Sequence, residues 1–195
     1  MLLSAPTRRP TRPQPAKRLM TAAEFSRLPE GPPYPELIEG ELFFMASPDL
    51  FHQEICRNLM LLLWSHVKAR GLGIVIAAPS DVQLDFLNVF QPDVYFIAKD
   101  RLHILDDHGP KGAPDLAVEV LSTGTVRKDR GKKKRVYARA GVKELWLVDR
   151  NARTVEVYVF TKSLDEPVAI LGERERLRTS LLPGLSIPVA SIFER

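Results

Sequence analysis

Apolar and polar positions along the chain recur at two different spacings. From Leu50 to Arg70 the apolar side chains follow the three- and four-residue spacing of a helix, and Gly71 ends the pattern. A capping box predicts a short helix over 21–28. A further helix is predicted from about Arg127 to Ala140. The chain therefore contains one long and two shorter predicted helices.

Short apolar runs between turn residues predict strands. Two runs flank Gly40 and predict a hairpin, and the last two are joined by a short polar stretch that predicts another. The three runs after the long helix predict a β meander. Because helices and strands are interleaved without strict alternation, the predicted class is α/β with a mixed β-sheet flanked by helices. The predicted strands are 36–39, 41–45, 73–77, 82–86, 91–97, 115–121, 143–149 and 154–160.

Composition separates a tail from one domain. The chain has 195 residues, 45% of them apolar, which is typical of a single globular domain with a core. Residues 1–18 contain four prolines and five basic residues without an acid, so we predict a disordered tail over 1–18 and one domain over 19–195. Without that tail the net charge of +4 becomes −1. Net charge is therefore weak evidence for nucleic-acid binding. The local basic run 127–135 either meets a phosphate backbone or forms a solvated helix face.

The cellular location is predicted from two features that the sequence lacks, a pair of cysteines and a membrane-spanning stretch. The one cysteine, Cys56, lies in an apolar helical run, which argues against a disulfide framework or a thiolate metal cluster. No apolar stretch approaches the roughly 20 residues that span a bilayer. The sequence predicts a cytoplasmic protein without membrane contact.

Two carboxylates stand in neighbouring apolar strands. Asp93 lies in the run 91–97 and Glu119 in the run 115–121. Burying a carboxylate among apolar residues is costly unless it is paired or holds a cation. Carboxylate and carbonyl oxygens are the ligands of hard divalent cations, so Asp93, Glu119 and the backbone carbonyl of Val120 form a predicted metal site for phosphodiester hydrolysis.

A lysine from the following helix completes this hypothesis. Asp129, Lys133 and Tyr137 are spaced four apart and share one helical face. Lys133 can then neutralise the negative charge that develops during hydrolysis. The alternative is a surface ion pair between Asp129 and Lys133, worth about 0.3–0.5 kcal/mol.

Several segments, taken together and in order, resemble one known family. From about Tyr34 to Asp149 the chain resembles the Uma-type restriction endonucleases of the PD-(D/E)xK nuclease superfamily, and a late segment, 181–185, is similar to the family's usual ending. The matching segments are 36–42, 52–53, 78–82, 91–93, 113–122, 129–131, 137–142 and 144–149.

The resemblance implies a restriction-endonuclease-like core of helix, three-stranded meander, helix and strand. It also implies a DNA endonuclease with Mg²⁺, or alternatively Mn²⁺, held by Asp93 and Glu119. Two departures stand out. Leu121 occupies the position at which the superfamily motif has lysine, and the segment 122–125 differs from the Ser-Pro-Ser-Thr that relatives tend to carry. The resemblance allows a lysine on the next helix to replace the missing one. Lys133 is the preferred candidate, with Lys132 and Lys134 as alternatives.

Other residues receive weaker predictions. Glu41 and His52 fall in matching segments where similar nucleases carry an additional acid or a water-orienting group, so both are supporting candidates. Their alternative roles are a solvent-facing hairpin acid and a helix cap. Trp64 and Trp146 lie in apolar runs and are predicted to be core residues rather than base-stacking platforms.

Three functional hypotheses follow. The first is a Mg²⁺-dependent DNA endonuclease. The second is a catalytically inactive nuclease-fold protein that binds nucleic acid or a protein partner, because Leu121 replaces the expected lysine. The third is a homodimer formed through exposed sheet edges.

Overall fold

A six-stranded sheet forms the centre of the molecule. The computed structural model describes residues 18–195 apart from 30, 33, 45–46, 123 and 125, so the predicted tail lies outside the described residues except for Arg18. The strand order is β12-β11-β10-β9-β6-β3. The strands are β3 (Gly73–Ala77), β6 (Val94–Ala98), β9 (Leu116–Leu121), β10 (Glu144–Asp149), β11 (Thr154–Val159) and β12 (Ala169–Gly172).

The pairing confirms a mixed sheet. β3 pairs antiparallel with β6, and β6 pairs antiparallel with β9. β9 and β10 are parallel, which requires the crossover helix between them, whereas β10 and β11 form the predicted antiparallel hairpin. Together with the preceding long helix, these strands make the predicted core of helix, three-stranded meander, helix and strand.

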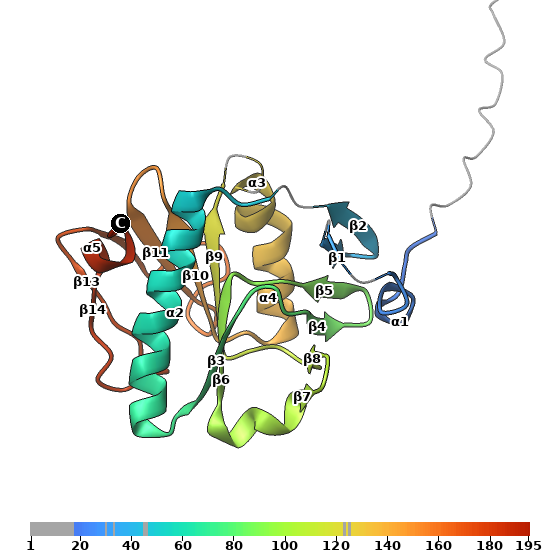
Figure 1. Cartoon of the computed structure of the whole chain (residues 1–195), viewed down its shortest axis with the longest axis horizontal. Helices are drawn as coiled ribbons and strands as arrows, with labels where there is room; N and C mark the ends of the chain where they lie inside the picture. Colours follow the sequence, from blue (N-terminus) through green and yellow to red (C-terminus); the bar gives the residue numbers. More distant parts are fainter. Residues whose placement is uncertain (1–17, 30, 33, 45–46, 123, 125) are drawn as a thin grey trace, which may run out of the picture.

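Helices cover both faces of this sheet (Figure 1). On one face lie α2 (Leu50–Arg70) and α5 (Val189–Ile192), and on the other lies a continuous helical run of α3 (Val126–Lys128), the π-helical segment η2 (Asp129–Lys133) and α4 (Lys134–Ala140). Side chains alternate along each strand, so β3, β6, β9, β10 and β11 each contribute to two cores. In β9, for example, Val118 packs towards α2 and Ala117 towards α4. None of the described helices is both long and apolar enough to cross a membrane.

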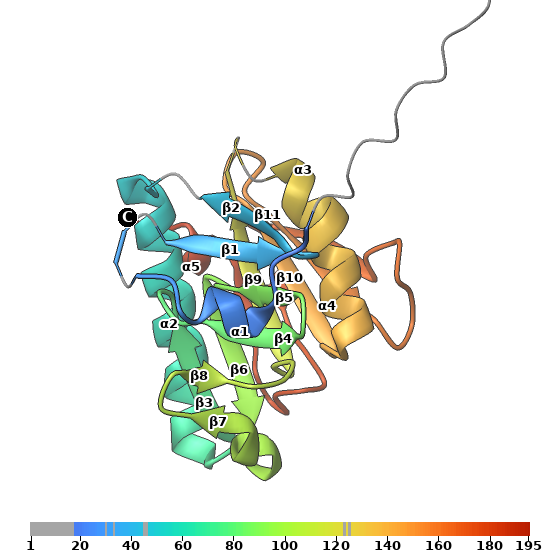
Figure 2. The same ribbon diagram turned by 90° about the vertical axis from the view of Figure 1, so that its right-hand side faces the viewer.

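A second, four-stranded sheet lies on the α4 side of the main sheet, with the short helix α1 (Ala22–Phe25) beside it (Figure 2). Its order is β2-β1-β5-β4, built from β1 (Pro35–Ile38), β2 (Glu41–Phe44), β4 (Val82–Asp85) and β5 (Asn88–Phe90). The predicted hairpin at Gly40 is confirmed by the antiparallel pairing of β1 and β2. The predicted meander needs a correction, because the run 82–86 leaves the main sheet for the small one. The strand that contains Glu119 takes its place.

The remaining elements are short. They are η1, a 3₁₀ helix (Lys99–Ile104), and the two-stranded pairs β7 (Leu105–Asp106) with β8 (Gly109–Pro110) and β13 (Arg176–Leu177) with β14 (Ile187–Pro188). These elements lie outside the six-stranded sheet.

Local chemistry sets the ends of α2. The Asp49 side chain accepts a hydrogen bond from the backbone N–H of His52 and caps the first turn. Gly71 ends the helix in the left-handed conformation with φ of 60°, which favours glycine. One expectation on this helix is wrong, because Trp64 is 42% exposed and lies under the Lys68 ammonium. Trp146 is fully buried, as predicted.

Asp115 ties the start of β9 to its neighbours. Its buried carboxylate accepts a hydrogen bond from the Ala98 N–H at 2.8 Å and pairs with Lys143 at 2.7 Å and Arg101 at 3.1 Å. Burial alone would raise the pKa of Asp115, but these three partners hold it below its ordinary value of 3.8. Asp115 therefore serves the fold and lies apart from the metal-site candidates.

Asp115→Asn should lower the free energy of unfolding by about 2–3 kcal/mol at pH 7, because the ion pairs with Lys143 and Arg101 are lost and the Ala98 N–H loses its charged acceptor. Since the folded-state pKa lies below 3.8, this contribution is fully present above pH 3.8 and disappears as the pH falls through the folded-state pKa. Urea unfolding of both proteins at a series of pH values should show the difference closing in acid. A difference that stays constant down to pH 3 would contradict this assignment.

Candidate active site

A cavity of about 1140 Å³ opens where several elements of the core meet. Its walls come from the first turns of α2, the residues before β6, the end of β9, η2 and the start of β1. The acidic and basic side chains that line it, together with the Cys56 thiol, are Glu36, Asp49, His52, Arg57, Asp93, Glu119, Lys128, Asp129, Lys133 and Arg150. The cavity therefore brings together residues that lie far apart in the sequence, from β1 to the residue that follows β10.

The pairing register places the two predicted carboxylates opposite each other. Val94 pairs with Val118, and one further step along the two antiparallel chains sets Asp93, just before β6, across from Glu119 in β9. The backbone N–H of Val120 donates to Asp93 Oδ2 at 2.7 Å. Both carboxylates and Val120 line the cavity. The structure thus brings together all three of the predicted metal ligands.

Lys133 lies at the centre of a buried ionic cluster. Its Nζ is 2.7 Å from Glu119 Oε1, 2.8 Å from Glu36 Oε1 and 3.8 Å from Asp129 Oδ1. Tyr137 also donates its hydroxyl to Glu119 Oε1 at 2.5 Å. The alternative of a surface pair is wrong, because the side chains of Asp129 and Lys133 are each only 2% exposed. The shared helical face predicted from the four-residue spacing points inward, at Glu119.

The structure distinguishes Lys133 from its two neighbours. Lys132 is 44% exposed and lies 3.6 Å from Glu39, while Lys134 donates to the Asp165 carbonyl. Leu121, which stands at the motif position, is buried in the core beside α4. Of the three lysines, Lys133 is the one whose ammonium contacts Glu119.

Burial and charge shift the pKa values in this cluster. Burial raises the pKa of Glu119 well above its ordinary value of 4.5; the Lys133 ammonium opposes the shift, and the carboxylates of Asp129, Glu36 and Asp93 add to it. Burial acts to lower the pKa of Lys133, but Glu119, Glu36 and Asp129 outweigh it, so this pKa is raised well above 10.5. Lys133 is therefore a cation within a cluster of carboxylates.

The donor set fits a divalent cation. The carboxylates of Glu36, Asp93, Glu119 and Asp129 line the cavity with Lys133, so the acids in this cluster outnumber the buried ammonium. One oxygen of Glu36, Oε2, is buried without a hydrogen-bond partner among the described residues. A buried carboxylate oxygen in this state is costly. A hard divalent cation would satisfy such oxygens and relieve the repulsion that raises the pKa of Glu119.

Of the two supporting candidates, His52 lines the cavity and Glu41 does not. His52 is 8% exposed, and its Nε2 lies 3.4 Å from Asp93 Oδ2. Burial acts to lower the pKa of His52, but Asp93 and a hydrogen bond with the Val120 backbone raise it overall. Glu41 lies on β2, at the position paired with Ile38, and is not one of the residues that line the cavity.

Sequence reasoning missed Glu36 and Cys56. Glu36 stands on β1, 97 residues before Lys133, and its Oε1 also accepts the backbone N–H of Gln91 at 2.9 Å. Its signal was an acid within a short strand whose neighbours are apolar. Cys56 follows His52 by four residues, a spacing that places both side chains on one face of a helix.

The basic run on the helix does not form one surface. Lys133 and Lys134 are buried, and Arg130 pairs with Asp149 and Glu156. Of the basic residues in this run, Lys128 and Lys133 line the cavity.

Basic and aromatic side chains surround the acids. Besides Lys128, Arg57 and Arg150 line the cavity, and Arg150 is held by Asp49 at 2.6 Å. Tyr34 and Phe44 also line it and are 45% and 63% exposed. Cations near an acidic centre, together with exposed aromatic rings, suit a ligand with phosphates and bases.

A protein family and a solved structure resemble the chain. No curated protein matches it. A solved structure described as a "putative nuclease belonging to DUF820" from Anabaena variabilis is similar, with a TM-score of 0.76 and 21% identity over 89% of this chain and 97% of that chain. This likeness confirms the restriction-endonuclease-like fold. The model of the Uma2 family, described as "Putative restriction endonuclease", matches residues 22–190. This match spans most of the sequence and agrees with the fold, so the chain belongs to the Uma2 family.

Proposed function

We propose that the protein is a Mg²⁺-dependent endodeoxyribonuclease, with Mn²⁺ as an alternative cofactor. The observation that carries this proposal is the pairing of Asp93 with Glu119 in a cavity where buried Lys133 contacts Glu119 directly. Membership of a family described as restriction endonucleases supports DNA as the substrate. We also propose that residues 19–195 form a single catalytic domain, whereas a homodimer stays a prediction.

Asp93, Glu119 and the Val120 carbonyl would hold the cation. When bound, a divalent cation stabilises charge on the phosphate and lowers the pKa of a bound water. Asp93 is positioned for this role by the Val120 N–H and by His52. Glu119 is positioned by Lys133 and Tyr137, which both approach its Oε1 atom.

The other residues act through position and charge. We assign to Lys133 the role of the missing motif lysine, because its ammonium lies within the carboxylate cluster on the cavity wall. His52 orients Asp93 and can hold a proton or a water beside it. Lys128 and Arg150 line the cavity and would contact the phosphates that flank the cleaved bond.

One observation favours the alternative, a nuclease-fold protein that binds without cutting. Glu119 Oε1 already accepts the Tyr137 hydroxyl and pairs with the Lys133 ammonium, so one oxygen of this proposed metal ligand has partners within the protein. If this cluster serves only stability, the protein should bind DNA in the presence of a chelator and yield no product at high Mg²⁺.

Calorimetric titration with Mg²⁺ and Mn²⁺, followed by incubation with supercoiled plasmid, tests the two functions. We expect wild type to bind metal and nick the plasmid, and Glu119→Gln to bind at least ~10-fold more weakly, because a charged ligand is lost.

Glu54→Gln is the matched control for this experiment. Glu54 is a glutamate on α2 that pairs with Arg195 and is not one of the residues that line the cavity. It should behave like wild type. Wild type that binds no metal, or that nicks equally well in a chelator, would overturn the proposal.

A further inference from the structure

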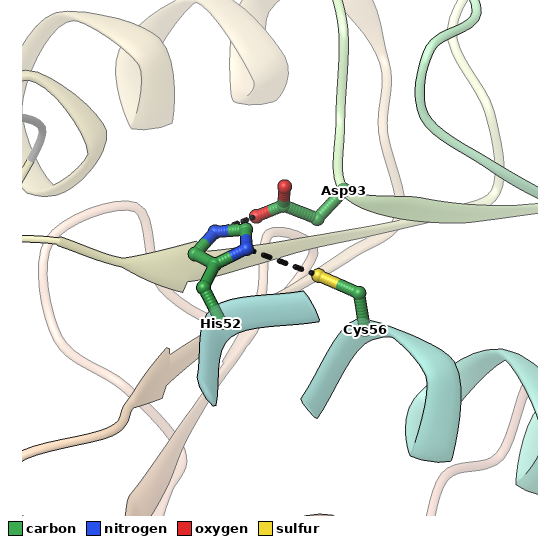
Figure 3. Close-up of side chains that lie close together, drawn as sticks. All are labelled: His52, Cys56 and Asp93. Atoms are coloured by element: carbon green, nitrogen blue, oxygen red, sulfur yellow. Dashed lines mark hydrogen bonds and ion pairs between the residues drawn. The ribbon is translucent and has the colours of Figure 1, made fainter. Parts of the chain in front are cut away.

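Three chemically different ligand groups meet at the first turns of α2 (Figure 3). His52 lies between Asp93 and Cys56, with its Nδ1 atom 3.4 Å from Cys56 Sγ and its Nε2 atom 3.4 Å from Asp93 Oδ2. One ligand atom from each residue lies within 4.8 Å of the other two. All three residues also line the cavity.

The geometry is close to that of a metal site. Bonds of about 2.0–2.3 Å to nitrogen, oxygen and sulfur place tetrahedral ligands roughly 3.3–3.8 Å apart. The spacing of up to 4.8 Å would contract by about 1 Å through side-chain rotation. His52 and Cys56 are one helical turn apart on α2, so the helix holds their relative position before any metal arrives.

The donor types indicate which metals would bind. The Asp93–Glu119 pair offers oxygen ligands, as Mg²⁺ requires. A thiolate and an imidazole instead favour Zn²⁺ and Co²⁺. Three protein ligands leave a fourth position open to the cavity, as in catalytic zinc sites.

The surroundings also favour a cation here. Asp93 is part of this group and Glu119 lines the same cavity, so two carboxylates accompany the position that a cation would take. A metal that binds the Cys56 sulfur displaces the thiol proton. On metal binding the sulfur–metal bond forms and this proton passes to the buffer. The divalent charge then replaces the proton beside the acids.

We propose that His52, Cys56 and Asp93 form a second cation position, which takes a thiophilic divalent metal of the Zn²⁺ or Co²⁺ class. This position shares Asp93 with the Mg²⁺ site of the proposed function. Occupying it withdraws Asp93 from Mg²⁺ and inhibits cleavage. Only the inhibition rests on the proposed function, since metal binding to these three residues does not.

Titration of the protein with Co²⁺ in the absence of DNA tests the binding. Cys56 is the only cysteine in the sequence, so a thiolate-to-Co²⁺ charge-transfer band can arise only from this residue. We expect the band in wild type and its loss in both Cys56→Ser and Cys56→Ala. Circular dichroism confirms that each variant is folded. Binding of Co²⁺ to wild type without this band would overturn the proposal.

Calorimetry of three variants separates the two cation positions. Cys56→Ser should weaken Zn²⁺ binding at least ~10-fold without a matching loss of Mg²⁺ affinity, because sulfur is a ligand of the soft metal alone. Glu119→Gln should weaken Mg²⁺ binding selectively, and Asp93→Asn should weaken both. Zn²⁺ affinity unchanged by Cys56→Ser would contradict the site.

The inhibition is measured separately, as the ratio of plasmid nicking with and without Zn²⁺ for each protein. Cys56→Ser should require at least ~10-fold more Zn²⁺ for half inhibition than wild type. If neither protein nicks DNA while the Co²⁺ band is present, the proposed nuclease function fails and the metal site stands. If nicking occurs but the band is absent, the metal site fails alone.

Discussion

Lys133→Met is expected to lower the free energy of unfolding by about 3–5 kcal/mol at neutral pH, because it leaves buried carboxylates without their partner. Lys133 Nζ lies 2.8 Å from Glu36 and 2.7 Å from Glu119, and the side chains of both acids are less than 10% exposed. The Lys133→Met variant should also lose its plasmid-nicking activity. Urea unfolding and plasmid nicking measure the two effects.

The stability loss should depend on pH. The pKa of Glu119 is already raised above 4.5 in the folded protein, and without the Lys133 ammonium it should rise further. An acid with a raised folded-state pKa destabilises the fold as the pH rises from the unfolded value through the folded one. The difference between wild type and Lys133→Met should therefore be largest at high pH and shrink as the pH falls towards 4.5.

Lys132→Met is the matched control for this change. Lys132 is the preceding residue, but its side chain is 44% exposed and its distance to Glu39 is 3.6 Å. Exposed pairs contribute little, so its free energy of unfolding should stay within about 0.5 kcal/mol of wild type. Equal losses in the two variants would mean that Lys133 has no special place in the cluster.

Asp93→Asn should reduce metal-dependent nicking at least ~100-fold while leaving the fold intact, because a charge that would hold the cation is lost. The asparagine side-chain carbonyl can still accept the Val120 N–H, which donates to Asp93 at 2.7 Å in the folded protein. Removing one charge from a group of carboxylates also lessens their repulsion. The free energy of unfolding of Asp93→Asn, measured in the presence of a chelator, should therefore stay within about 1 kcal/mol of the wild-type value.

Asp106→Asn controls for the general loss of a negative charge. Asp106 lies on β7 and pairs with Lys111, outside the set of residues that line the cavity. This variant should nick plasmid at the wild-type rate. Asp93→Asn that cleaves as fast as Asp106→Asn would show that Asp93 has no part in the chemistry.

Local pattern was sufficient for most of the elements. The apolar spacing over 50–70 predicted α2 with its observed bounds, because helical periodicity reports directly which face is buried. The same reasoning failed for Trp64, since an apolar residue in a helix also lies on the exposed face when no neighbour covers it. Pattern also placed 82–86 in the wrong sheet, because strand propensity carries no information about the pairing partner.

Some residues of the candidate site were predicted from the sequence, and others were found only in the structure. Asp93 and Glu119 were predicted to be neighbours because each stands out as an acid in an apolar strand, and the register sets them opposite each other. The spacing of Asp129, Lys133 and Tyr137 predicted one shared face. Spacing alone left open whether that face meets solvent or the core. Glu36, the buried acid that pairs with Lys133, lies on a strand 97 residues before that lysine.

The sequence by itself determined the helices, most of the strands and the two central carboxylates, because these depend on the periodicity and chemistry of neighbouring residues. Only the tertiary structure decided that Lys133 is the lysine that contacts Glu119, that Glu36 rather than Glu41 lines the cavity, and that Cys56 lies beside His52 and Asp93. Each of these outcomes depends on which distant segments pack together. The burial of a residue and the charges around it are set by those distant segments, so a local sequence pattern cannot predict them.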